Sequence, residues 1–191
     1  PAGVLKLAGK LADGTAWSQS SPVLPDGWWP LYVALYTGKG STHGWLQFTN
    51  NGDADLGGSL SWIKQTNGAS KYYPPGFTNE YEVVGSLYVS PGTNRIVTIT
   101  NGTLSFLHGN LIAPITNSVL LTSNNKITNL SSNKLTMTFT TSSGLFAGSV
   151  TDTNTSKLLP FSGVVLQKLD SGYGYFLGTN QSGRVMLQPL P

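Results

Sequence analysis

The side chains that most often carry out catalysis are few in this chain. Its two histidines are His43 and His108, and no serine lies in the Gly-x-Ser-x-Gly setting of a nucleophilic hydrolase. A glycosidase needs two carboxyl groups that face each other across a sugar. The chain has eight acids, four in predicted turns and two on one face of a strand: Asp13, Asp26, Asp53, Asp55, Glu80, Glu82, Asp152 and Asp170. An Asp in a turn normally caps its own backbone, so we predict no catalytic residues and no enzyme.

One short segment has the spacing of oxygen ligands that opens a calcium loop. Asn51, Asp53 and Asp55 alternate along the chain, as the first ligands of an EF-hand do. The same pattern then requires glycine where Leu56 stands and glutamate where Trp62 stands. Both are missing, so we interpret the segment as a polar turn and predict no metal and no cofactor.

Aromatic side chains are the more informative group. Flat rings flanked by amides and hydroxyls suit a sugar, because the apolar face of a pyranose stacks on the ring while polar groups take its hydroxyls. We predict a platform carried by strands, formed by Tyr32, Tyr36 and Trp45. We also predict a cleft carried by loops, formed by Trp28, Trp29, Tyr72 and Tyr73. The alternative for each ring is burial, and we expect Trp62 and at least one of Trp28 and Trp29 to fill a core.

Composition limits the classes of function. Only 10% of the 191 residues are charged, and Ser, Thr and Asn together number 56. The net charge of +3 comes from basic residues that are scattered singly, whereas nucleic-acid binding needs a clustered basic face. No apolar stretch approaches the roughly 20 residues of a membrane helix. We therefore predict neither nucleic-acid binding nor membrane insertion.

Alternating apolar residues and frequent Gly, Pro and Asn turns predict an all-β fold. The 23 glycines and 11 prolines favour short strands over helices. We expect strands that include Leu31–Tyr36, His43–Thr49, Tyr81–Val89 and Arg95–Thr100, and no helix of ten or more residues. A dozen or more short strands at this spacing are typical of a sandwich or barrel.

Two stretches share one plan, which suggests an internal repeat. Pro30–Phe48 and 159–188 both run from a proline through an apolar strand and a glycine-rich turn to a strand that opens with Gly and an aromatic. We predict two related antiparallel units, about residues 1–100 and 101–191, that form a single all-β domain as one barrel, a pair of packed barrels or a sandwich.

The pairing within each repeat can also be predicted. Placing Leu35 opposite Gly44, and Leu166 opposite Gly174, gathers aliphatic side chains on one face and aromatics with amides on the other. In the second unit this predicts Val164 and Leu166 on the buried face and Val165 on the other.

The first unit lacks the strand that should precede Val4. Either the strand at the C-terminus closes its sheet, or the missing strand lies in chain upstream of this sequence. An unpaired edge there would invite strand addition from another molecule.

Several segments together resemble a β-rich module found in the C-terminal parts of large secreted proteins of environmental bacteria. They include WPLYVALYTGKG, GWLQF, YYPPGFTNE, LTMTFTTSSGLFAGSVTD and GYGYFLGTNQSGRV, and the resemblance covers nearly the whole chain. It implies a secreted or cell-surface accessory module with no catalytic site. We expect the partner to be a polysaccharide or cell-surface glycan. The alternative is a structural module, a stalk, anchor or filament subunit, that contacts neighbouring domains or copies of itself.

Overall fold

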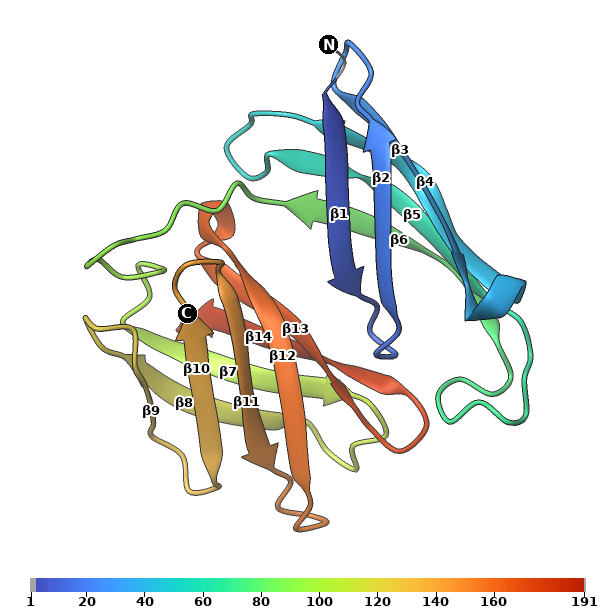
Figure 1. Ribbon diagram of the computed structural model, residues 1–191. Coiled ribbons are helices and arrows are strands. Elements are labelled where there is room, and N and C mark those ends of the chain that lie inside the picture. The colour runs from blue at the N-terminus through green and yellow to red at the C-terminus, as the bar shows by residue number, and fades with distance from the viewer. Residues whose placement is uncertain (1–2, 191) are drawn as a thin grey trace. The chain divides into compact units, whose positions relative to one another are not determined.

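The computed structural model describes residues 3–190, and the chain in it is all-β, as predicted (Figure 1). It divides into two compact units, Pro1–Ser86 and Leu87–Pro191. The sequence-based division lies near residue 100 instead. We call the two parts unit 1 and unit 2. The described residues contain no helix long and apolar enough to cross a membrane.

Unit 1 consists of a hairpin and a four-stranded antiparallel sheet. The hairpin pairs β1 with β2, and the sheet has the order β3-β4-β5-β6. The bounds are β1 Val4–Lys10, β2 Ala16–Pro22, β3 Trp28–Leu35, β4 Gly40–Phe48, β5 Leu56–Lys64 and β6 Phe77–Gly85, with a 3-10 turn, η1, at Tyr36–Gly38.

A small apolar core holds the hairpin against the sheet. Trp29, Leu31 and Leu46 are its buried centre, and Leu5, Leu7 and Trp17 of the hairpin pack around them. No ladder joins β2 to β3. Side chains replace it: Gln19 Nε2 donates to the carbonyl of Pro30 at 3.4 Å, and Gln19 Oε1 accepts from the N–H of Tyr32 at 3.1 Å.

The predicted pairing of β3 with β4 is wrong in register but right in its faces. Leu35 lies opposite Gly40, not Gly44, because the 3-10 turn makes the connection tight. The error is four residues, an even number, and side chains alternate with period two. Leu31, Leu35 and Leu46 therefore still lie on the buried face, and Tyr32 and Trp45 on the exposed one.

Unit 2 is an antiparallel sheet of eight strands in the order β10-β11-β12-β13-β14-β7-β8-β9, which curls into a nearly closed barrel. The bounds are β7 Asn101–His108, β8 Ile115–Leu121, β9 Ile127–Asn129, β10 Leu135–Thr140, β11 Leu145–Thr151, β12 Leu158–Leu166, β13 Ser171–Leu177 and β14 Ser182–Pro189, with a 3-10 turn, η2, at Gln167–Leu169.

Asparagines bridge the seam between β9 and β10, the two ends of the sheet. The fully buried Asn117 of β8 donates from its amide nitrogen to Asn129 at 3.0 Å and also to Asn133. Asn133 returns a bond to Asn117 at 3.3 Å and reaches the carbonyl of Thr151. Side-chain amides thus take the place of the missing ladder.

The segment before β7 is not the strand that the sequence predicts at Arg95–Thr100. It is irregular, and it buries Ile96, Val97 and Ile99 in the core of unit 2. The Gln167 amide bonds Val89 and Ile96, and the Asp170 carboxylate accepts from the N–H and hydroxyl of Thr98. These side chains satisfy backbone groups that a ladder would otherwise pair.

The predicted register of β12 with β13 is also wrong, and here the error reverses a face. Leu166 lies opposite Ser171, so the shift is three residues, an odd number. Val165 is consequently buried and Val164 exposed, the reverse of the prediction. The pair Gly163 and Gly174 makes room for Phe146, since a Cβ at Gly163 would come within 2.2 Å of that ring.

The strand at the C-terminus does not close the sheet of unit 1. β14 pairs with β13 on one side and β7 on the other, both in unit 2. Within the described residues, β1 has a strand partner on one side only.

Candidate functional site

Three exposed aromatics of unit 1, Trp28, Tyr32 and Trp45, lie together on the outer face of its four-stranded sheet, opposite the hairpin. The ladder places side chains in cross-strand rows on this face. One row runs Pro30, Trp45, Ser59, Glu82 from β3 to β6. The next runs Tyr32, His43, Ser61, Glu80. Each row thus passes from apolar and aromatic groups to a hydroxyl and then a carboxylate, and we call this surface the outer face.

Three rings on the outer face are open to a ligand. Trp28 is 39% exposed, Trp45 54% and Tyr32 64%. Trp28 meets Trp45 edge to face, with ring centroids 6.5 Å apart and planes at 84°. Tyr32 lies beside His43 at 6.3 Å. The perpendicular tryptophans form a corner, in which one ring presents its face and the other its edge.

The polar groups of the outer face are arranged around these rings. Ser59 Oγ donates to Glu80 Oε1 at 2.9 Å, and Ser41 Oγ lies 3.3 Å from His43 Nδ1. All of these side chains belong to strands, so the ladder fixes their spacing. Rings for stacking and oxygens for hydroxyl groups are what recognition of a sugar requires.

Four of the seven predicted site residues do not belong to this surface, and the first two are Trp29 and Tyr36. Trp29 is only 1% exposed, and its ring nitrogen donates to Ser21 Oγ at 2.6 Å. It therefore fills the core, as the alternative interpretation expected for one of the two neighbouring tryptophans. Tyr36 is not on the strand: it opens the 3-10 turn with a positive φ of 53° and points to a buried carboxylate.

The predicted cleft of Trp28, Trp29, Tyr72 and Tyr73 does not form. Tyr72 and Tyr73 lie in the loop between β5 and β6 and are half-buried. The Tyr73 ring packs edge to face on Trp62 and Phe77, at centroid distances of 6.3 and 5.0 Å. Trp62 is itself buried, as expected. These rings extend the interior of unit 1 and are not part of the outer face.

A buried polar cluster ties the hairpin turn to the sheet. Asp13 Oδ2 accepts from the Tyr36 hydroxyl at 2.7 Å and from Lys64 Nζ at 3.4 Å. Lys64 also donates to the carbonyl of Tyr72 at 2.7 Å, and Trp62 Nε1 donates to the Tyr36 hydroxyl at 3.0 Å. Both members of the ion pair are buried. Every group has a partner, so the cluster acts as an internal tie and leaves no group free for a substrate.

The cluster shifts the pKa of two of its members in opposite directions. Burial works to raise the pKa of Asp13, but hydrogen bonds from Tyr36 and Thr15, with the charge of Lys64, outweigh it and lower the pKa below its usual value. Burial, and then the bond to Asp13, raise the pKa of Tyr36. At neutral pH the site is an ion pair with a neutral phenol.

The segment with calcium-like spacing is a capped turn. Asn51 Oδ1 accepts from the N–H groups of Asp53 and Ala54, at 3.0 and 2.7 Å. Among residues 3–190, no three His, Cys, Asp or Glu side chains lie together as metal ligands would.

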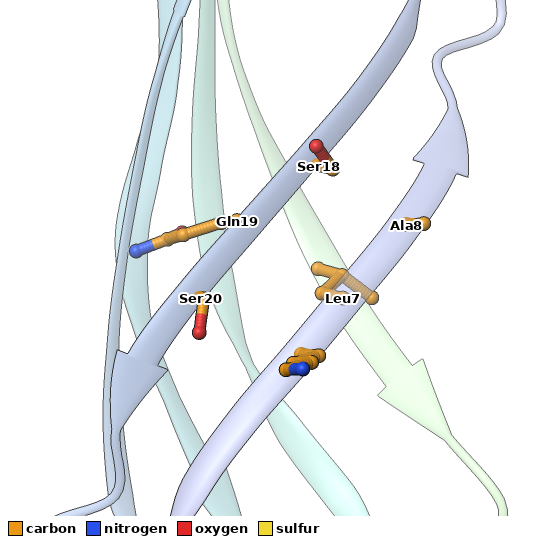
Figure 2. A pocket seen from close by; sticks show the side chains of 6 residues that line it. Leu7, Ala8, Ser18, Gln19 and Ser20 are labelled. Atoms are coloured by element: carbon orange, nitrogen blue, oxygen red, sulfur yellow. The ribbon is translucent and has the colours of Figure 1, made fainter.

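The β1–β2 hairpin of unit 1 carries a shallow depression (Figure 2). Leu7 and Ala8 of β1 and Ser18, Gln19 and Ser20 of β2 line it, together with Lys6. It has no aromatic ring and no carboxylate, and Gln19 is already bonded to β3. It offers a ligand little beyond hydroxyls and one ammonium.

The predicted alternation put His43 on the same face as Tyr32 and Trp45, and the structure confirms this. Sequence reasoning missed four further neighbours of the rings, which are Ser59, Ser61, Glu80 and Glu82. The signal was present in the period-two alternation of β4, β5 and β6, but these residues can be placed on one surface only once the registers are known.

Comparison of the chain with protein-family models, curated proteins and solved structures finds no match.

Proposed function

We propose that this chain is a non-catalytic binding module of a larger secreted or cell-surface protein, and that its outer face binds carbohydrate. One observation supports this above the others: Trp28, Tyr32 and Trp45 are exposed together on a regular sheet face, and the rows of Tyr32 and Trp45 also carry hydroxyl and carboxylate side chains. Exposed rings grouped in this way mark an interaction site.

Trp45 is the main anchor in this proposal. It lies at the centre of the face, between Pro30 and Ser59, and its neighbour Trp28 closes one side. A pyranose stacked on Trp45 would meet the hydroxyls of Ser59 and Ser61 towards β6. Tyr32 offers a second ring for the next sugar unit along the chain.

Affinity electrophoresis against a panel of soluble polysaccharides tests the proposal. We expect at least one neutral glycan to retard the parent protein and to change its tryptophan emission. Trp45→Ala should weaken binding at least about tenfold, or 1.4 kcal/mol, with smaller losses for Tyr32→Ala and Trp28→Ala. Tyr81→Ala is the matched control, because Tyr81 is 45% exposed but lies on the inner side of the same sheet.

Two results would contradict the proposal. One is the absence of retardation by every glycan in the panel. The other is an equal loss of binding in Tyr81→Ala and Trp45→Ala, which would show that the outer face is not the site.

Assembly through strand addition is the second candidate, and the open edges of β1 and β6 favour it. Among the described residues each of these strands has a ladder partner on one side only. If unit 1 assembles in this way, its sedimentation coefficient should rise with protein concentration. A monomer at all concentrations, together with glycan binding, would remove this candidate.

A further inference from the structure

The ionisable side chains of strands β3 to β6 on the outer face, apart from tyrosine, are two glutamates and one histidine, His43. Glu80 and Glu82 lie on β6 at the end of the two rows that begin at the aromatic rings. The outward positions of the sheet, strand by strand, are Trp28, Pro30, Tyr32, Ala34; Ser41, His43, Trp45, Gln47; Gly57, Ser59, Ser61, Ile63; and Thr78, Glu80, Glu82, Val84. They include two carboxylates and no lysine or arginine.

The lysine of these strands points the other way. Lys64 lies on the inner side, where it pairs with Asp13. Both glutamates are exposed, and Glu80 Oε1 accepts a hydrogen bond from Ser59 Oγ. The carboxylates therefore keep acceptor capacity for a ligand. Two exposed glutamates alone would be an ordinary solvated edge, but here the same rows carry the exposed rings.

We infer that the outer face selects amino-sugar glycans, polymers whose sugar units carry protonated amines. This inference rests on the proposed function and names the ligand class for the same site. The sugar ring stacks on Trp45 or Tyr32, and its ammonium group lies towards Glu82 or Glu80. A cation is also attracted to the face of a tryptophan ring. Uronate and sulfate glycans meet like charge and are disfavoured.

Strand spacing makes this arrangement possible. Adjacent strands lie about 4.8 Å apart, so Trp45 of β4 and Glu82 of β6 are separated by two spacings, roughly 10 Å between backbones. Both side chains project from the same face. One sugar ring with its amino substituent bridges that interval.

The selectivity at each carboxylate is modest, because exposed charges are screened by water and salt. An exposed ion pair contributes about 0.2–1 kcal/mol, or up to about fivefold in affinity per pair. A polymer with an amine on each unit engages both glutamates, so we expect a preference of several fold at low salt that decreases as salt is added.

Oligomers of glucosamine and of N-acetylglucosamine of equal length provide the test, at a pH where the amines are protonated. They differ in charge while sharing the ring that stacks. Isothermal titration of the intact chain should show tighter binding of the glucosamine oligomer. Glu80→Gln/Glu82→Gln should remove this preference, so that the two oligomers bind with equal affinity. Asp26→Asn, an exposed acid in the turn before β3, is the matched control and should keep the preference.

The outcomes separate this inference from the proposed function. Equal affinity for the two oligomers, or a preference that survives in the double glutamine variant, would overturn the amino-sugar inference and leave carbohydrate binding intact. If Trp45→Ala binds both oligomers as well as the parent does, stacking on the outer face is refuted. If neither oligomer and no neutral glycan binds, the proposed function fails together with the inference.

Discussion

The two units of this chain share one local element but use it differently. Each has a strand, a 3-10 turn and a returning strand, β3-η1-β4 in unit 1 and β12-η2-β13 in unit 2. In unit 2 the element lies inside a nearly closed sheet around sixteen buried apolar residues. In unit 1 it belongs to an open sheet whose central cluster has three.

The distribution of aromatic residues follows the same division. All five tryptophans lie in unit 1, and unit 2 has none. Matching the buried strands of the two elements, Leu31 with Phe161 and Leu35 with Val165, places Leu158, Ser162 and Leu177 where unit 1 has Trp28, Tyr32 and Trp45. The element itself therefore does not require surface rings. Because the exposed tryptophans occur in unit 1, the proposed binding role is placed on that unit.

The largest expected effect tests how unit 1 compensates for its small core. Asp13→Ala or Lys64→Met leaves one buried charge without its partner, which costs about 3–5 kcal/mol. We expect the free energy of unfolding to fall by this amount. Urea denaturation followed by tryptophan fluorescence measures it. The double variant should lose less than the sum of the two. A loss below about 1 kcal/mol in both single variants would contradict the role of the cluster as a tie.

The corresponding test in unit 2 concerns its seam. Asn117→Ala removes the hydrogen bonds that the fully buried Asn117 amide makes with Asn129 and Asn133. The loss of these bonds at a buried position costs about 1–3 kcal/mol. Tyrosine fluorescence or circular dichroism should report this loss, while the tryptophan signal of unit 1 keeps its midpoint. Equal shifts in both signals would show that the two units unfold as one.

The smallest effect is a difference in acid response. Burial works to raise the pKa of Asp152, but hydrogen bonds from Thr155 and Asn154 lower it, and Asp13 is likewise lowered. A carboxylate with a lowered folded-state pKa stabilises the fold above its unfolded pKa near 3.9, and this stability is lost as the pH falls through the folded value. One such group changes stability by at most about 1.4 kcal/mol per pH unit.

Substitution should separate the two contributions to acid sensitivity. Asp152→Asn should flatten the pH dependence of unit 2 below pH 4, measured by circular dichroism, and leave the tryptophan signal unchanged. Asp13→Asn should do the reverse. If Asp152→Asn leaves the slope of unit 2 as steep as in the parent, its hydrogen bonds do not favour the charged form.

Much of the fold could be predicted because the strands alternate and glycine, proline and asparagine mark their ends. What could not be predicted were the registers. The sequence favours strands that continue through Tyr36 and Gln167, but Tyr36–Gly38 and Gln167–Leu169 fold as tight 3-10 turns. The register error between β3 and β4 was an even number of residues and left the faces correct. The register error between β12 and β13 was odd, so the buried and exposed positions of Val164 and Val165 were exchanged.

The candidate site was predicted in part for the same reason. Alternation alone placed Tyr32 and Trp45 together, since both lie on strands. Trp28 and Trp29 are adjacent, so one of them had to be buried, and the burial of its neighbours Leu31 and Leu46 decides that it is Trp29. Tyr36 could not be placed, because its partner Asp13 is distant in sequence and nothing local signals their contact.

The order of strands in unit 2 has a mechanical consequence. Its first and last strands, β7 and β14, are antiparallel neighbours, and Gly102 at the start of one lies opposite Pro189 at the end of the other. Tension applied at those two points would peel the ladder open one bond at a time instead of shearing all its bonds together. On the N-terminal side, however, the pull must first detach Val89, Ile96 and Thr98 from Gln167 and Asp170. Under a force applied from the N-terminal side, the hydrogen bonds of that irregular segment would therefore bear the load before the strands of the sheet separate.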